Sequence, residues 1–173
     1  MKHYCGIDHD LLYTTIMFHD LGTMVNREEH HLHSSKMVYM DNSLPLWFNS
    51  DNIITIATAC YEHRNSLNFR NLERTIYSAI LSDSDRLESY TYLDVEETIT
   101  RMIFRVRGYN KGQEPDENKL CELVYSHIHK KFGKNGPKLI LNLSKEKYGK
   151  VVKEVASKLE DKAGFTRFYF DLL

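Results

Sequence analysis

The spacing of the apolar residues constrains the fold of this chain more than any other feature. These residues recur every three or four positions, as on one face of a helix, and seldom alternate as they do in a half-buried strand. The 173 residues include only 8 glycines and 3 prolines, so few positions would interrupt a helix. The pattern therefore predicts an all-α fold. The run Leu139–Leu143 could form a strand, but the sequence offers it no partner strand.

Capping residues and chain breakers divide the helical pattern into segments. Ser50 or Asp51 can cap one helix, and another begins with Asp94-x-x-Glu97, which resembles a capping box. The aromatic tail over 165–170 is expected to close the core, because aromatic side chains bury large areas. Helices are expected over residues 8–22, 28–41, 50–60, 71–89, 94–106, 120–133 and 145–161.

The composition is that of an ordinary globular protein. Hydrophobic residues make up 42% and charged residues 27% of the chain, which suits one domain over 1–173 that is large enough to bury a core. The net charge of −1 provides no electrostatic footprint for nucleic acid or an anionic membrane surface. We therefore expect neither nucleic acid nor a membrane among the partners.

The cysteines and the N-terminus indicate the cellular compartment. Cys5, Cys60 and Cys121 are isolated and form no C-x-x-C pair, as is typical of thiols in a reducing compartment. Asp8 and Asp10 interrupt the apolar stretch that a signal peptide would need. No segment approaches the ~20 apolar residues of a membrane span. A cytoplasmic location is expected.

An adjacent histidine and aspartate, His19-Asp20, end the first apolar segment, and later segments offer His63 and Asp85. Three separated segments could thus supply nitrogen and oxygen ligands to one divalent cation. Such a donor set suits Fe, Mn, Zn or Co better than Ca or a metal that prefers thiolates. Successive helical residues point about 100° apart, so His19 and Asp20 can reach one ion only at a helix end, which Gly22 favours.

Four pieces of the sequence carry a resemblance to a known family: His19-Asp20, then Glu28-Glu29-His30-His31 with Ser34-Ser35, then Glu62-His63-Arg64, and last Ser82-Asp83-Ser84-Asp85-Arg86. In this order and spacing, the chain resembles the HD-domain superfamily of metal-dependent phosphohydrolases, in the variant whose extra histidines allow two metals. The resemblance covers roughly the first hundred residues. It implies an HD-like helical bundle, with an HD core over 1–108 and a helical extension over 109–173.

The resemblance implies a ligand set for one or two divalent ions, which could be Mn, Fe, Zn, Co or Mg. His19, Asp20 and Asp85 would hold the first ion. His30 and His63 would extend the site toward a second ion, with the Asp20 carboxylate able to bridge. Either ion would lower the pKa of a bound water and polarise a phosphoryl group.

The neighbours of these ligands have expected roles as well. His31 is the alternative to His30 as a ligand, and Asp83 could orient a ligand or a water molecule. Asp20 belongs to the expected catalytic set. Phosphate oxygens would be bound by the cations beside the ligands, the arginines bidentately: Arg64, Arg86 and Lys36.

The chain departs from the family pattern at its beginning. The pattern starts with another histidine about two helices upstream of the His-Asp pair, and only eighteen residues precede His19. We therefore expect either a shortened N-terminus or a lost ligand, and a homo-oligomer that covers apolar faces around Leu12, Ile16 and Ile56. Two functions stay open: a phosphohydrolase acting on a nucleotide or other small phosphorylated metabolite, and an impaired HD-like domain that binds a nucleotide or a protein partner.

Overall fold

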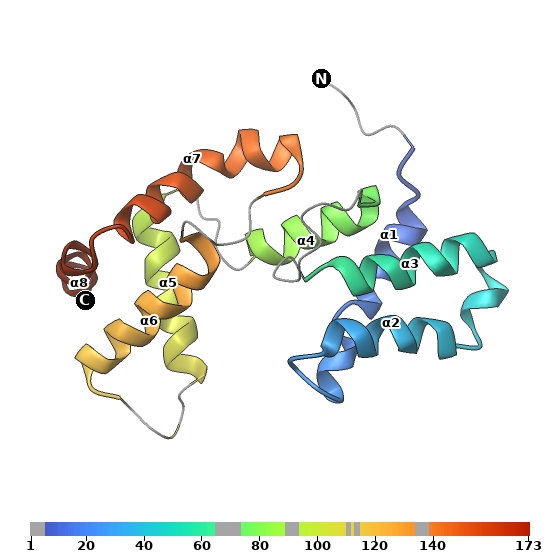
Figure 1. Cartoon of the computed structure of the whole chain (residues 1–173), viewed down its shortest axis with the longest axis horizontal. Helices are drawn as coiled ribbons and strands as arrows, with labels where there is room; N and C mark the ends of the chain where they lie inside the picture. The colour runs from blue at the N-terminus through green and yellow to red at the C-terminus, as the bar shows by residue number, and fades with distance from the viewer. Residues whose placement is uncertain (1–5, 65–73, 89–93, 110–111, 113–114, 134–138) are drawn as a thin grey trace. The chain divides into compact units, whose positions relative to one another are not determined.

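The computed structural model describes residues 6–64, 74–88, 94–109, 112, 115–133 and 139–173 of the chain (Figure 1). Within these ranges every regular element is a helix, so the predicted all-α fold is confirmed. The chain divides into two compact units, Met1–Asp85 and Arg86–Leu173. The sequence predicts a single domain over 1–173, with a core over 1–108. The compact units divide earlier, at Asp85.

The first unit holds three long helices, most of a fourth and two short 3-10 helices. Asp8 caps the first helix, because its side chain accepts hydrogen bonds from the backbone N–H groups of Asp10 and Leu11. Asn49, and not the expected Ser50 or Asp51, caps the third helix. The bounds are α1 (His9–Phe18), η1 (Leu21–Met24), α2 (His30–Met40), η2 (Leu44–Leu46), α3 (Ser50–Glu62) and α4 (Ile76–Glu88).

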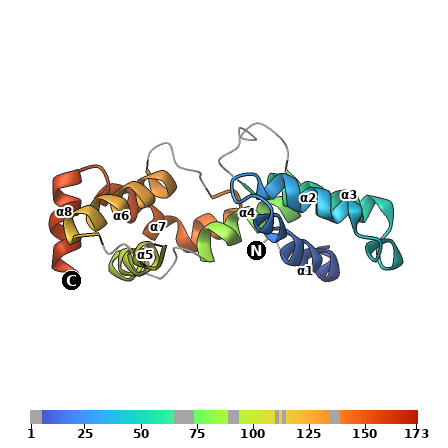
Figure 2. The ribbon, with the colours of Figure 1, turned by 90° about the horizontal axis from the view of Figure 1, so that it is seen from below.

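A core of apolar side chains holds α1, α2 and α3 together. In both views α2 and α3 run alongside each other, and α1 packs against both of them (Figure 1, Figure 2). On α3, Ile56 and the small Ala57 are fully buried. The third helix therefore contributes the most deeply buried residues of this core. The other buried members of the core are Leu11, Val38, Leu44 and Cys60.

Gly22 lets η1 lie directly against the first turn of α2. Its backbone N–H donates to Ser34 Oγ over 2.9 Å, and Ser34 is fully buried. A Cβ atom at Gly22 would lie 2.7 Å from the backbone nitrogen of Ser34 and would collide with the carbonyl oxygen of His30. Only glycine permits this approach. The close contact brings the end of α1 next to the beginning of α2.

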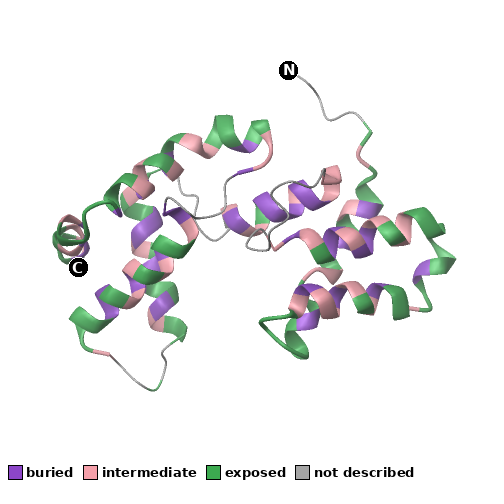
Figure 3. Cartoon of the chain, viewed as in Figure 1, coloured by how far each residue is buried: buried purple, intermediate pink, exposed green. Residues whose placement is uncertain are grey.

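The second unit has its own core, formed by the remaining four helices. Phe165 and Tyr169 are almost completely buried, so the expectation that the aromatic tail closes the core is confirmed. Buried residues occur in both units (Figure 3). Leu139–Leu143 forms no strand, because α7 already begins at Asn142. The bounds are α5 (Val95–Tyr109), α6 (Glu117–Phe132), α7 (Asn142–Lys158) and α8 (Lys162–Asp171).

His127 on α6 should make the stability of this unit depend on pH. Burial lowers its pKa below the usual 6.5, and the nearby charges of Lys131, Arg105 and Lys130 lower it further. The fold therefore favours the neutral ring, whose contribution to stability is complete above pH 6.5 and is lost as the pH falls toward the lowered value. Thermal unfolding from pH 7 to 5 should show a smaller decline in melting temperature for His127→Gln than for the wild type. Equal declines would contradict this prediction.

None of the helices that the structure describes is long and apolar enough to cross a membrane.

Candidate metal centre

Three histidines and one aspartate lie at helix ends of the first unit. His19 follows the last residue of α1, His63 follows the last residue of α3, and His30 is the first residue of α2. Asp20 leaves the helical conformation, with φ −108° and ψ 0°. The chain turns at Asp20, and this turn lets two adjacent residues, His19 and Asp20, direct their side chains to one region, which they could not do in mid-helix.

The carboxylate of Asp20 lies among the three imidazoles. Its Oδ1 atom is 3.3 Å from Nε2 of His30 and 3.9 Å from Nε2 of His63. Its Oδ2 atom is 3.6 Å from Nε2 of His19. The ligand atoms of Asp20, His30 and His63 all lie within 4.8 Å of one another, as in a metal-binding group. The two oxygens of Asp20 therefore face different histidines.

Backbone carbonyls orient all three imidazole rings in the same way. The Nδ1 atom of each ring lies 2.6 to 2.7 Å from the carbonyl oxygen of the residue three positions earlier, which is Ile16 for His19, Arg27 for His30 and Cys60 for His63. A carbonyl oxygen only accepts hydrogen bonds, so each Nδ1 carries the proton. This leaves Nε2 as the nitrogen that faces the cluster and that can bind a metal, as in metal-bound histidines.

A cation would satisfy this arrangement. The Nε2 atoms of His30 and His63 are only 3.0 Å apart, and neither neutral ring has a proton to place between them. His63 is 2% exposed, and burial lowers its pKa to about 4, although its hydrogen bond to the Cys60 carbonyl raises it. A proton is therefore poorly held between the rings. The donor set fits a divalent transition metal, whose nitrogen ligands must be neutral.

Cys60 lies near the cluster but is not one of its ligands. Its Sγ atom is 3.8 Å from the carbonyl oxygen of Thr15, inside the core. Burial, and next the negative charge of Asp20, raise the pKa of Cys60 to about 12. Because thiolates and not thiols bind metals, this residue stays an uncharged core side chain.

The structure distinguishes His30 from His31. The His30 ring lies in the cluster, with its centroid 5.0 Å from that of His63. His31 is 5% exposed, and its ring lies 5.7 Å from that of Tyr61. Burial, followed by the positive charge of Arg64, lowers the pKa of His31. Of the two residues that the sequence left open, His30 is the one whose Nε2 reaches Asp20.

The aspartates of α4 lie outside the group of three. Asp85 is half-buried, and its negative charge slightly offsets the effect of burial by raising the pKa of His63. Asp83 is 1% exposed, and its charge raises the pKa of Arg74. The charge of Asp85 thus acts on His63, whereas the charge of Asp83 acts on Arg74.

The three expected phosphate ligands have different surroundings. Arg86 is 6% exposed, donates to the carbonyl oxygen of Lys131 over 2.7 Å, and lies 5.5 Å from the centre of the Phe132 ring. Both of these contacts lie within the second unit. Arg64 directly follows His63 and is half-buried, and Lys36 is exposed on α2.

Polar residues that no sequence pattern indicated join α3 to α4. Arg74 donates to the carbonyl oxygen of Glu62, and the Ser78 hydroxyl donates to the Glu62 carboxylate. Glu62 was noted only as the neighbour of His63. No spacing rule predicted these contacts, because Arg74 and Ser78 meet Glu62 only after the chain has folded back.

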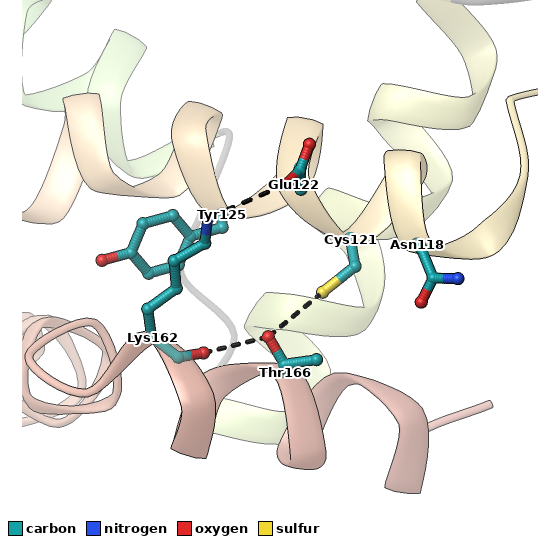
Figure 4. A pocket seen from close by; sticks show the side chains of 6 residues that line it. All are labelled: Asn118, Cys121, Glu122, Tyr125, Lys162 and Thr166. Carbon is teal, nitrogen blue, oxygen red and sulfur yellow. Dashed lines mark hydrogen bonds and ion pairs between the residues drawn. The ribbon is translucent and has the colours of Figure 1, made fainter.

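A hollow lies in the second unit, between α6 and α8 (Figure 4). It has a volume of about 150 Å³. Lys162 Nζ lies 3.8 Å from Glu122 Oε1, and Cys121 Sγ lies 4.0 Å from Thr166 Oγ1. These polar groups are paired with one another and do not converge on a common point. Asn118 and Tyr125 complete the lining.

No family model, no curated protein and no solved structure matches the chain. The resemblance to the HD-domain superfamily therefore depends on the quoted residues alone.

Proposed function

We propose that the chain is a metal-dependent phosphohydrolase that acts on a nucleotide or another small phosphorylated metabolite. The observation that supports this function is the convergence of two imidazole Nε2 atoms, from His30 and His63, on one oxygen of Asp20. This donor set suits Mn, Fe, Zn or Co. The order of the ligand segments along the chain is also that of the HD-domain superfamily.

Each residue of the cluster has a role in this proposal. A bound divalent cation would lower the pKa of a water molecule and polarise a phosphoryl oxygen. His30 and His63, with their Nδ1 protons held by carbonyls, present neutral nitrogens to it. One carboxylate oxygen of Asp20 faces His30, and the other faces His19. This carboxylate would therefore be able to bridge two ions. Asp85 would add a second carboxylate.

The phosphate would be bound by Arg64. Its guanidinium group follows a cluster histidine directly in the chain and is half-buried. A guanidinium fork can hold two phosphate oxygens at once, which orients the phosphoryl group toward the ligands. We place the activity in the cytoplasm, where thiols such as the buried and unbridged Cys60 and Cys121 stay reduced.

The experiment that tests this proposal compares His30→Ala with His31→Ala. The wild-type chain, supplied with Mn²⁺, should hydrolyse at least one member of a panel of nucleotides and aryl phosphates. His30→Ala should lose ~100-fold or more in rate, because small misplacement of a reacting group already has such an effect. His31→Ala should keep the activity, since that ring packs on Tyr61.

Two results would contradict the proposal. The first is equal activity of the wild type and His30→Ala. The second is metal binding without hydrolysis of any phosphate, which would favour the impaired HD-like domain that binds a nucleotide or a protein partner.

A further inference from the structure

Arg74 links the end of α3 to the body of α4. Its Nη1 atom donates to the carbonyl oxygen of Glu62 over 3.0 Å and to Ser82 Oγ over 3.4 Å. Glu62 is the last residue of α3 and directly precedes His63. Ser82 lies three positions before Asp85, about one helical turn. One guanidinium group therefore contacts α3 directly before His63 and α4 one turn before Asp85.

The charge of Arg74 is compensated from both helices. Burial lowers the pKa of Arg74, while the negative charges of Glu62 and Asp83 raise it. Arginine stays protonated in proteins and offers several donors in a planar fork, so it can serve acceptors on two helices at once. The neighbouring carbonyl is at the C-terminal end of α3, where a helix dipole favours a cation.

A second contact acts on the same junction. The hydroxyl of Ser78, which is fully buried, donates to Glu62 Oε2 over 2.6 Å. Ser78 in turn lies 2.8 Å from the hydroxyl of Thr75, one turn earlier. The Glu62 carboxylate is thereby directed to α4. The neighbouring Tyr77, in the same first turn of α4, accepts a hydrogen bond on its hydroxyl from the backbone N–H of Asp8 over 3.0 Å.

We propose that Arg74 is a positioning residue, which sets the distance between His63 and Asp85 by holding the end of α3 against α4. This inference rests on the proposed metal site, because the two residues belong to its ligand set. Without the guanidinium group, α4 keeps its contacts through Ser78 and Tyr77 but loses the link through Ser82, one turn before Asp85. The distance between His63 and Asp85 is then less well fixed, and the affinity for the ion falls.

The test is a titration of the whole chain with Co²⁺, whose visible absorption reports ligand number and geometry. Arg74→Met should weaken Co²⁺ binding by about 10-fold to 100-fold, as the loss of a residue supporting a metal ligand usually does, and should change the spectrum. Arg74→Lys keeps a charged donor and should lose less. Tyr77→Phe is the matched control, because it removes a hydrogen bond between α4 and Asp8 but none of the contacts to Glu62 or Ser82, and it should keep the wild-type spectrum.

The outcomes separate the positioning role from the site itself. If the wild type binds Co²⁺ and Arg74→Met binds it with the same affinity and spectrum, the positioning role is wrong. If the wild type binds no Co²⁺, the metal site fails and the positioning role fails with it. Should Arg74→Met not fold, Ser82→Ala removes one acceptor of the guanidinium group and should weaken binding in the same direction. An unchanged affinity in Ser82→Ala would then overturn the role.

Discussion

Replacing Asp20 by asparagine should remove most of the metal-binding capacity of the chain. Its carboxylate approaches all three imidazoles, at 3.3, 3.6 and 3.9 Å. The amide keeps the shape but lacks the negative charge that offsets a divalent ion. Loss of a residue that only supports a ligand reduces affinity about 10-fold to 100-fold, so the loss of Asp20 should exceed ~100-fold. Equilibrium dialysis with Mn²⁺ or Zn²⁺, followed by elemental analysis, measures it.

Thermal unfolding provides a second measure of the same change. A ligand that binds only the folded state stabilises it, so Mn²⁺ should raise the melting temperature of the wild type but not that of Asp20→Asn. Asp51→Asn is a suitable control, because this aspartate is exposed in the first turn of α3. A similar metal content in Asp20→Asn and the wild type would rule out the cluster as the binding site.

Replacing Gly22 by alanine should destabilise the first unit and disrupt the cluster. The added Cβ atom would collide with backbone atoms of His30 and Ser34, which cannot move as a flexible side chain can. We expect a loss of about 3 kcal/mol in the free energy of unfolding, at the upper end of the usual penalty for overpacking. Because η1 would be pushed away from α2, metal affinity should fall as well. Chemical denaturation and Co²⁺ titration measure the two effects.

Gly149→Ala is the matched control for this substitution. Gly149 lies within α7, and a Cβ atom there would meet nothing within 4 Å. Alanine in a helix interior is favoured over glycine by about 0.5 to 1 kcal/mol, so this variant should be slightly more stable than the wild type. If Gly22→Ala is as stable as Gly149→Ala, then η1 does not lie against α2 as described.

The positions of the helices could largely be predicted from local features. Asp8 caps the start of α1. The backbone N–H of Glu97 donates to the Asp94 carboxylate over 2.8 Å, as expected for the start of α5. Helix ends were less predictable, since α1 ends at Phe18 and a 3-10 helix follows, where one helix to Gly22 was expected. The turn at Asp20 depends on packing against α2, which the local sequence does not contain.

The sequence by itself determined the helical class of this protein and the residue types of its candidate site. Apolar spacing and the scarcity of glycine and proline are local properties, and they are sufficient to specify helices. The chemistry of His19, Asp20, His30 and His63 as possible ligands likewise follows from their side chains alone. None of these features requires knowledge of which segments meet in space.

Only the tertiary structure decided which of these side chains face one another. His30 and His31 are adjacent, so they point about 100° apart on α2, and the packing of α2 against α3 and η1 selects the one that faces the cluster. Asp85 and Arg86 are also adjacent on a helix and point in different directions. The charge of Asp85 acts on His63, whereas Arg86 packs on Phe132. The rotation of a helix about its axis is set by its neighbours, and a single sequence does not state which neighbours those are.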